Sequence, residues 1–185
     1  MTSPSTSSNP KYNFTGKVAL VTGSSSGIGA AIAPKLAQYG AHLTITGRNR
    51  ENLTKVGKKI EAVSGGHVPL QLIGDLLDPA TGEMLVKETI AKYGRCKCFD
   101  GADLWRTVTL KFLPSVDILV NNAGGASAHG DLLKGGTQLL KDFDAVHKLN
   151  VRAPVQLIQL AMPHLVKTKG NVLNIVSVDG ITPVS

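Results

Sequence analysis

The stretch KVALVTGSSSGIG, Lys17 to Gly29, decides the fold of this chain. Its apolar beginning ends in a glycine, which is typical of a short buried strand. From Ile28 to Tyr39 alanines and leucines recur at helical spacing, and Gly40 ends the helix. A strand, a glycine-rich turn and a helix in this order predict a phosphate-binding site, because a helix N-terminus offers unpaired N–H groups to an anion.

The glycines of this turn have distinct expected tasks. Gly23 lets the chain turn sharply, Gly27 lets backbone amides approach a phosphate, and Gly29 lets the helix pack closely against the strand. The other residues of the turn that are expected to bind the phosphates are Ser25, Ser26 and Ile28. A plain tight turn is the alternative, and the strand before it and the helix after it favour the binding site.

The alternation of strand and helix continues along the chain. Further strands are predicted over 41–46, 67–75, 116–121 and 171–177, and further helices over 49–64, 78–93 and 137–168. Asp78 is the expected N-cap of the second of these helices, and Pro154 and Pro163 are expected local breaks in the last. This alternation predicts an α/β doubly wound parallel sheet of about five strands in the order 3-2-1-4-5, whose ligand lies at the carboxyl ends of the strands.

Composition excludes several classes of protein. The net charge of +7 is spread along the chain without a nucleic-acid-binding motif, so no nucleic-acid partner is expected. Cys96 and Cys98 are the only cysteines, which predicts neither a disulfide framework nor a metal site. The sequence shows no apolar run long enough to span a membrane and no apolar leader, so a soluble cytoplasmic protein is expected.

Two motifs carry a resemblance to a known family. TGSSSGIG, from Thr22, and NNAG, from Asn121 to Gly124, resemble the Thr-Gly-x-x-x-Gly-x-Gly and Asn-Asn-Ala-Gly motifs of the short-chain dehydrogenase/reductase family. The resemblance implies a Rossmann-like NAD(P)-binding domain over 14–185, after a disordered tail over 1–13. It also implies an oxidoreductase that reduces carbonyls or oxidises alcohols of small molecules by hydride transfer, and a homo-oligomer in the full-length form.

The residues after the second predicted strand indicate the type of cofactor. An acidic residue there would bind the ribose hydroxyls of NAD, but this sequence has Gly47 followed by Arg48. Because an arginine can bind a 2′-phosphate, the resemblance favours NADP over NAD. A surface charge without a ligand is the alternative for Arg48.

The remaining cofactor contacts are implied by the resemblance. Asp75 matches the aspartate that binds the adenine amino group, with a helix-capping role as the alternative, and Leu76 lies beside the ring. Asn121 matches the residue that ties the central strands together. The residues expected to pass close to the ribose are Asn122, Ala123 and Gly124.

Two of the family's four catalytic side chains have counterparts here. Asn150 matches the asparagine that supports a proton-relaying water, and Ser177 matches the serine that binds the substrate oxygen. The family's tyrosine follows that serine by about thirteen residues and its lysine comes four later, which places both beyond residue 185. The pair Tyr93 and Lys97 has the same spacing but precedes the fourth strand, so no catalytic role is expected for it.

Two departures from the family pattern leave alternatives open. The 20 residues from Cys96 to Ser115 form an irregular insert, within about 95–116, that is either a retained short intron or a partner-binding loop. The chain is also expected to be a form truncated before the Tyr-x-x-x-Lys motif, with an incomplete sheet edge, low stability and no catalytic activity of its own. A non-catalytic nucleotide-binding or regulatory isoform and a non-functional fragment are the alternatives to an oxidoreductase.

Overall fold

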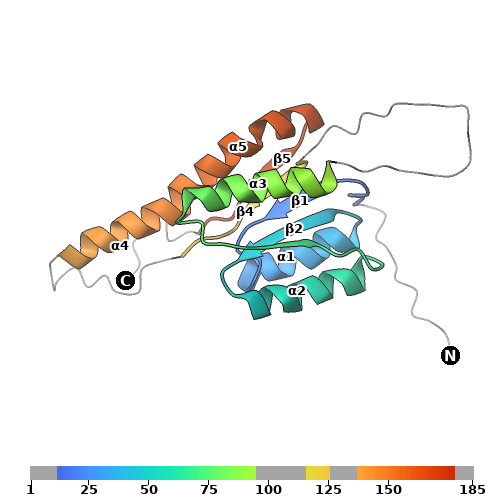
Figure 1. Cartoon of the computed structure of the whole chain (residues 1–185), viewed down its shortest axis with the longest axis horizontal. Helices are drawn as coiled ribbons and strands as arrows, with labels where there is room; N and C mark the ends of the chain where they lie inside the picture. The colour runs from blue at the N-terminus through green and yellow to red at the C-terminus, as the bar shows by residue number, and fades with distance from the viewer. Residues whose placement is uncertain (1–11, 95–115, 126–136, 178–185) are drawn as a thin grey trace, which may run out of the picture.

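A computed structural model describes residues 12–94, 116–125 and 137–177. Five strands form one parallel sheet: β1 (Val18–Val21), β2 (His42–Gly47), β3 (Leu70–Ile73), β4 (Ile118–Asn121) and β5 (Asn171–Asn174). Their order is β3-β2-β1-β4-β5, which confirms the predicted doubly wound α/β fold (Figure 1). Residues 1–11 of the predicted tail over 1–13, the insert with Cys96, Cys98 and Lys97, and residues 178–185 lie outside the described residues.

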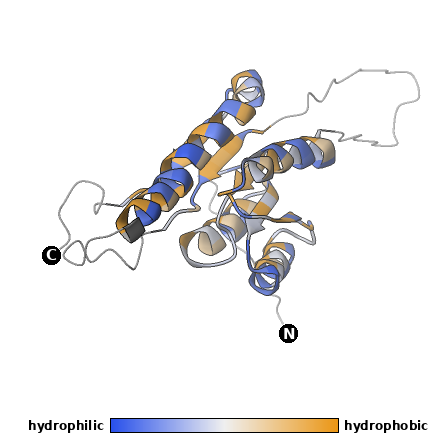
Figure 2. Ribbon diagram, turned by 60° about the vertical axis from the view of Figure 1, so that its left-hand side comes forward, coloured by the Kyte–Doolittle hydropathy of each residue, from blue (hydrophilic) through white to orange (hydrophobic). Residues whose placement is uncertain are grey.

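Helices cover both faces of the sheet. Helices α1 (Gly27–Gln38) and α2 (Arg50–Val63) pack on one face, and α3 (Pro79–Tyr93) and α5 (Ala153–Thr168) pack on the other (Figure 1). The strand at the centre of the molecule consists of hydrophobic residues, whereas the helices carry both hydrophobic and hydrophilic residues (Figure 2). Each face therefore has its own apolar core, and the fully buried β1 separates the two.

The parallel register brings the carboxyl ends of the strands to one edge of the sheet. Val21 of β1 lies beside Ile45 on one side and Val120 on the other. The segments that follow β1, β2 and β4 therefore leave the sheet at the same level, and the segment after β3 begins next to them.

Three predicted strands are longer than the observed β3, β4 and β5, and β4 begins at Ile118 rather than 116. β3 begins at Leu70 rather than 67, because Pro69 has no N–H to donate and the N–H of His67 binds the Ser64 hydroxyl instead. β5 ends at Asn174 rather than 177, since its partner β4 ends at Asn121 and the chain there turns away. Ser177 therefore lies three residues beyond the strand that was expected to carry it.

The long predicted helix is interrupted, but not by its prolines. Helix α4 (Thr137–His147) continues through a π-helical segment, η2 (Lys148–Arg152), into α5, and together they form one rod (Figure 1). Pro154 lies in the first turn of α5, where its missing N–H is harmless, and Pro163 lies inside the helix. The break is instead the wider turn of η2, a feature often found at functional sites.

No helix among the residues described here is long and apolar enough to cross a membrane. Over 12–94, 116–125 and 137–177, no three His, Cys, Asp or Glu side chains gather as metal ligands would.

Tyr93 joins helix α3 to the ends of two strands. Its hydroxyl donates to the carbonyl of Leu43 at 2.7 Å and accepts from the N–H of Leu70 at 3.0 Å. Both partners lie near the amino ends of their strands, at the edge of the sheet opposite to the turns after the strands. Tyr93 is thus a structural side chain.

Burial raises the pKa of Tyr93 to about 12, although the hydrogen bond from Leu70 acts in the opposite direction. A group whose pKa rises on folding contributes stability below its unfolded pKa, near 10.0, and loses it as the pH rises through the folded value. We expect Tyr93→Phe to lower the free energy of unfolding by about 1 kcal/mol at pH 8, because two backbone groups lose their partner. Denaturant unfolding should also show the unchanged protein losing more stability than Tyr93→Phe between pH 10 and 12, and parallel losses would contradict the assignment.

Candidate nucleotide-binding site

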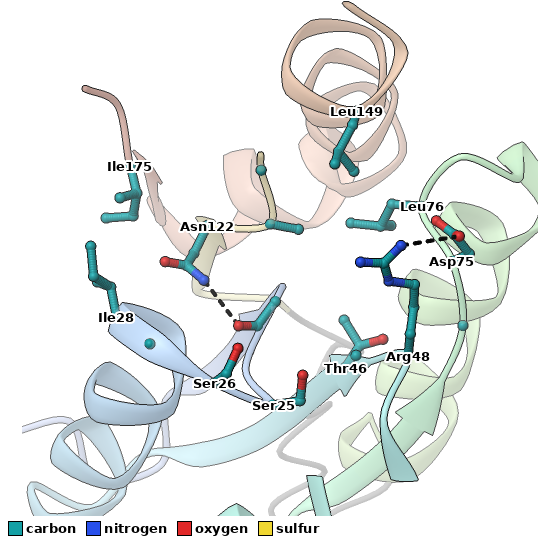
Figure 3. Close-up of a pocket in the computed structure, with 16 residues that line it drawn as sticks. Ser25, Ser26, Ile28, Thr46, Arg48, Asp75, Leu76, Asn122, Leu149 and Ile175 are labelled. Carbon is teal, nitrogen blue, oxygen red and sulfur yellow. Dashed lines mark hydrogen bonds and ion pairs between the residues drawn. The ribbon is translucent and has the colours of Figure 1, made fainter. Parts of the chain in front are cut away.

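A pocket lies at the carboxyl edge of the sheet, where the segments after the strands meet. Its volume is about 430 Å³. Arg48, Asp75 and Leu76 lie at one end and Ile28 and Ile175 at the other (Figure 3). It is lined by Gly23, Ser25, Ser26, Gly27, Ile28, Thr46, Gly47, Arg48, Gly74, Asp75, Leu76, Asn122, Ala123, Gly124, Leu149 and Ile175. Every residue that the sequence assigns to the cofactor lines this pocket, except Gly29.

Gly29 lies behind the pocket wall. A Cβ at this position would meet the Asn122 amide nitrogen and would come within 2.6 Å of the Gly23 carbonyl oxygen. The close approach that requires glycine here is therefore to the turn and to Asn122, rather than to the strand alone. Gly29 shapes the pocket without reaching its surface.

Gly23 begins the first turn with a left-handed backbone, φ +63°. A Cβ here would lie 2.8 Å from the Cα of Ala123. The two turns after β1 and β4 are thus in direct backbone contact, which no larger residue at this position permits.

Hydrogen bonds hold the turn after β4 against the turn after β1. The buried Thr22 hydroxyl accepts from the N–H groups of Asn122 and Ala123, each at 3.0 Å. In return, the Asn122 side-chain amide donates to the carbonyls of Thr22 at 3.0 Å and Gly23 at 3.1 Å. The wall of the pocket is therefore built from segments about 100 residues apart in the chain.

Helix α1 points its N-terminus into the pocket, and its first N–H groups lack a side-chain cap. The N-cap residue Ser26 makes no capping hydrogen bond within the described part of the chain, and the first turn has no acidic residue. By contrast, Asn49 caps α2 and Asp78 caps α3, as predicted for Asp78. The start of α1 is therefore suited to an anion, which would supply the missing acceptor.

The end of β2 places a glycine and an arginine at the pocket. A Cβ on Gly47 would lie 2.6 Å from the Ser25 hydroxyl oxygen, so a larger residue would displace the first turn. Arg48 extends along the pocket with 75% of its side chain exposed, and one guanidinium nitrogen lies 3.8 Å from Asp75 Oδ2. The arginine is accessible to a ligand and already has an anionic neighbour.

Asp75 lies in the segment between β3 and α3. Its Oδ1 accepts from the N–H of Leu77 at 3.0 Å, which fixes a tight turn before α3. The capping role considered as an alternative for Asp75 belongs instead to Asp78, whose side chain accepts from the N–H of Ala80. Asp75 is thus a pocket residue with one oxygen held by the backbone and the other near Arg48.

Thr46 supplies a polar atom that still lacks a partner. Its hydroxyl oxygen is buried and makes no hydrogen bond to any described residue, although Thr46 lines the pocket. Buried hydroxyls are nearly always hydrogen-bonded, so this atom indicates that the pocket suits a polar ligand.

Neither Asn150 nor Ser177 lines the pocket. Asn150, on η2, accepts from the N–H of Gly125 at 3.0 Å and donates to the carbonyl of the same residue at 2.8 Å. Its amide thus holds the chain after β4. Ser177 is exposed beyond the end of β5.

Sequence reasoning missed four lining residues: Thr46, Gly74, Leu149 and Ile175. Thr46 directly precedes Gly47, and Gly74 directly precedes Asp75. The rule that ligands lie at the carboxyl ends of strands could therefore have identified both. Leu149 and Ile175 are ordinary apolar residues next to Asn150 and near Ser177, with no signal of their own.

Comparisons with known proteins agree with this geometry. The family model described as Enoyl-(Acyl carrier protein) reductase matches residues 23–184. An uncharacterized oxidoreductase of Staphylococcus epidermidis is 28% identical over 169 residues, covering 90% of this chain and 60% of the relative. The chain therefore spans well under two thirds of that relative's length.

Solved structures of oxidoreductases are also similar to this chain. A metagenomic short-chain oxidoreductase in complex with NADP is 31% identical with a TM-score of 0.73, covering 93% of this chain and 67% of that one. L-Sorbose reductase from Gluconobacter frateurii, complexed with NADPH and L-sorbose, is 25% identical with a TM-score of 0.71, covering 93% and 56%. This chain belongs to the short-chain dehydrogenase/reductase family of oxidoreductases.

Proposed function

We propose that this chain binds NADP in the pocket at the carboxyl edge of the sheet. The observation that carries the proposal is the arrangement of the uncapped α1 N-terminus and the exposed Arg48 around one cavity. These are two separate sites for anions, which a dinucleotide with a pyrophosphate and a 2′-phosphate requires. The similar metagenomic and Gluconobacter structures contain NADP and NADPH, which supports the proposal.

Each end of the pocket suits a different part of the cofactor. The turn Ser25 to Gly27 and the start of α1 would hold the pyrophosphate, and Arg48 would hold the 2′-phosphate. Asp75 and Leu76 would contact the adenine, and the segment Asn122 to Gly124 would lie along the ribose. The nicotinamide would then lie toward Ile28 and Ile175.

Gly47 supports NADP over NAD for a steric reason. An acidic side chain there would bind ribose hydroxyls, but any side chain at this position would collide with the Ser25 hydroxyl. The chain therefore offers a cation where an NAD-specific site offers a carboxylate.

We further propose that the whole protein is an oxidoreductase for a small carbonyl or alcohol, without nucleic acid as a partner. The bound nicotinamide would supply or accept the hydride. Asn150 would order the chain after β4 next to the reaction site, and Ser177 would bind the substrate oxygen.

We expect Arg48→Met to weaken NADP binding by about 10-fold while NAD affinity changes less than about 3-fold, because one exposed charge-assisted contact is lost. Isothermal titration of the full 185-residue chain with each nucleotide measures both. Arg50→Met is the matched control, since Arg50 is an exposed arginine that does not line the pocket. Tight NAD binding together with unchanged NADP binding in Arg48→Met would overturn the NADP assignment.

A further inference from the structure

The ion pair between Arg48 and Asp75 crosses one end of the pocket. Both side chains line the cavity, and the shortest distance between their charged atoms is 3.8 Å (Figure 3). Arg48 is 75% exposed and Asp75 43% exposed, so a ligand can reach both groups. A phosphate that binds Arg48 must therefore approach a carboxylate that already attracts the same guanidinium.

Asp75 is held in place independently of Arg48. Its Oδ1 accepts from the N–H of Leu77 at 3.0 Å, so the carboxylate would stay at the pocket when the arginine moves to a ligand. Its negative charge would then face the incoming phosphate.

We propose that Asp75 restrains the preference of this site for a 2′-phosphorylated ribose, by competing for Arg48 and by repelling the phosphate. The inference rests on the proposed NADP function of the same pocket. It makes Asp75 a residue that sets phosphate selectivity in addition to any contact with adenine. The site would then keep measurable affinity for the unphosphorylated nucleotide.

Asp75 has two effects on the binding of a phosphate, and they act in opposite directions. The carboxylate orients the arginine toward the pocket, which favours phosphate binding, but an exposed pair of this kind contributes little orientation energy. Asp75 also repels a phosphate dianion that binds next to it. Two unit charges 4 Å apart in water already change a binding constant by a factor of about 5. Because a phosphate dianion carries more charge than the guanidinium cation, repulsion is the larger effect.

The test compares 2′,5′-ADP with 5′-AMP, two probes that differ only in the 2′-phosphate. The ratio of their affinities isolates the phosphate, because any contact of Asp75 with adenine affects both probes equally. Asp75→Asn removes the charge and keeps an oxygen for the N–H of Leu77, so the turn before α3 is retained. Glu83→Gln, an exposed change on α3 outside the pocket, controls for net charge.

We expect Asp75→Asn to raise the ratio in favour of 2′,5′-ADP by about 5-fold in low salt and by less at high ionic strength. Glu83→Gln should leave the ratio unchanged. An unchanged or lower ratio in Asp75→Asn would overturn the inference. If Arg48→Met still lowers the ratio in that case, the proposed NADP function stands alone. If neither probe binds the unchanged chain, the proposed function fails and the inference fails with it.

Discussion

Replacing Gly23 by alanine is expected to lower the free energy of unfolding by about 3 kcal/mol and to abolish measurable nucleotide binding. The left-handed backbone at this position, φ +63°, is unfavourable for alanine. In addition, the new Cβ would lie 2.8 Å from the Cα of Ala123, a backbone atom that cannot rotate away. The turns after β1 and β4 would have to separate, and both form the wall of the pocket.

Gly65→Ala provides the matched control for this change. Gly65 has a similar backbone, φ +70°, but no described atom lies within 4 Å of its Cβ position. It should lose only the conformational contribution, about 1 kcal/mol, and keep nucleotide affinity. Denaturant unfolding and nucleotide titration of both variants would separate the two contributions, and equal losses in both would refute the role of the contact with Ala123.

Thr22→Val is expected to lower the free energy of unfolding by about 2 to 3 kcal/mol and nucleotide affinity by about 10-fold. Valine has nearly the same shape, but it cannot accept the hydrogen bonds that the Thr22 hydroxyl takes from Asn122 and Ala123. Thr22 is 1% exposed, so water has little access to replace it. The segment that is proposed to line the ribose would lose two of its hydrogen bonds to the turn after β1 and keep those from the Asn122 side chain to the carbonyls of Thr22 and Gly23.

Thr22→Ser is the control, because serine keeps the acceptor and loses only a methyl group. We expect it to retain nucleotide affinity within about 3-fold and most of the stability. If Thr22→Ser loses as much nucleotide affinity as Thr22→Val, the hydrogen bonds are not what positions the turn.

The parts of the fold that local sequence patterns determine were predicted well. Strand β1 is a continuous apolar run that ends in glycine, β2 is an alternating run, and the predicted starts of α2 and α3 coincide with their N-caps Asn49 and Asp78. The strand order follows from the alternation of elements and the preferred handedness of their connections, together with the family resemblance. The pocket residues followed from the rule that ligands lie at the carboxyl ends of strands, together with the family resemblance.

The features that were missed depend on contacts between distant segments. The π-helical turn η2 leaves no mark in the helical spacing of 137–168, since its cause is a wider turn rather than a breaking residue. The bond pair between Asn150 and Gly125 joins two segments that no local pattern relates. Likewise, the pairing of Arg48 with Asp75 follows only from the positions of two neighbouring strand ends. β5 was predicted too long because its length depends on where β4 stops pairing.

The position of β1 at the centre of the sheet has a consequence for synthesis on the ribosome. β1 can pair with β2 early, but its other edge stays open until β4 emerges about 100 residues later. At a translation rate of 5 to 20 residues per second, this interval lasts roughly 5 to 20 s. Throughout it, a strand that is completely buried in the finished protein, Val18–Val21, exposes unpaired backbone groups to neighbouring chains. The nascent chain is therefore prone to edge-to-edge aggregation from the synthesis of β1 until β4 has emerged.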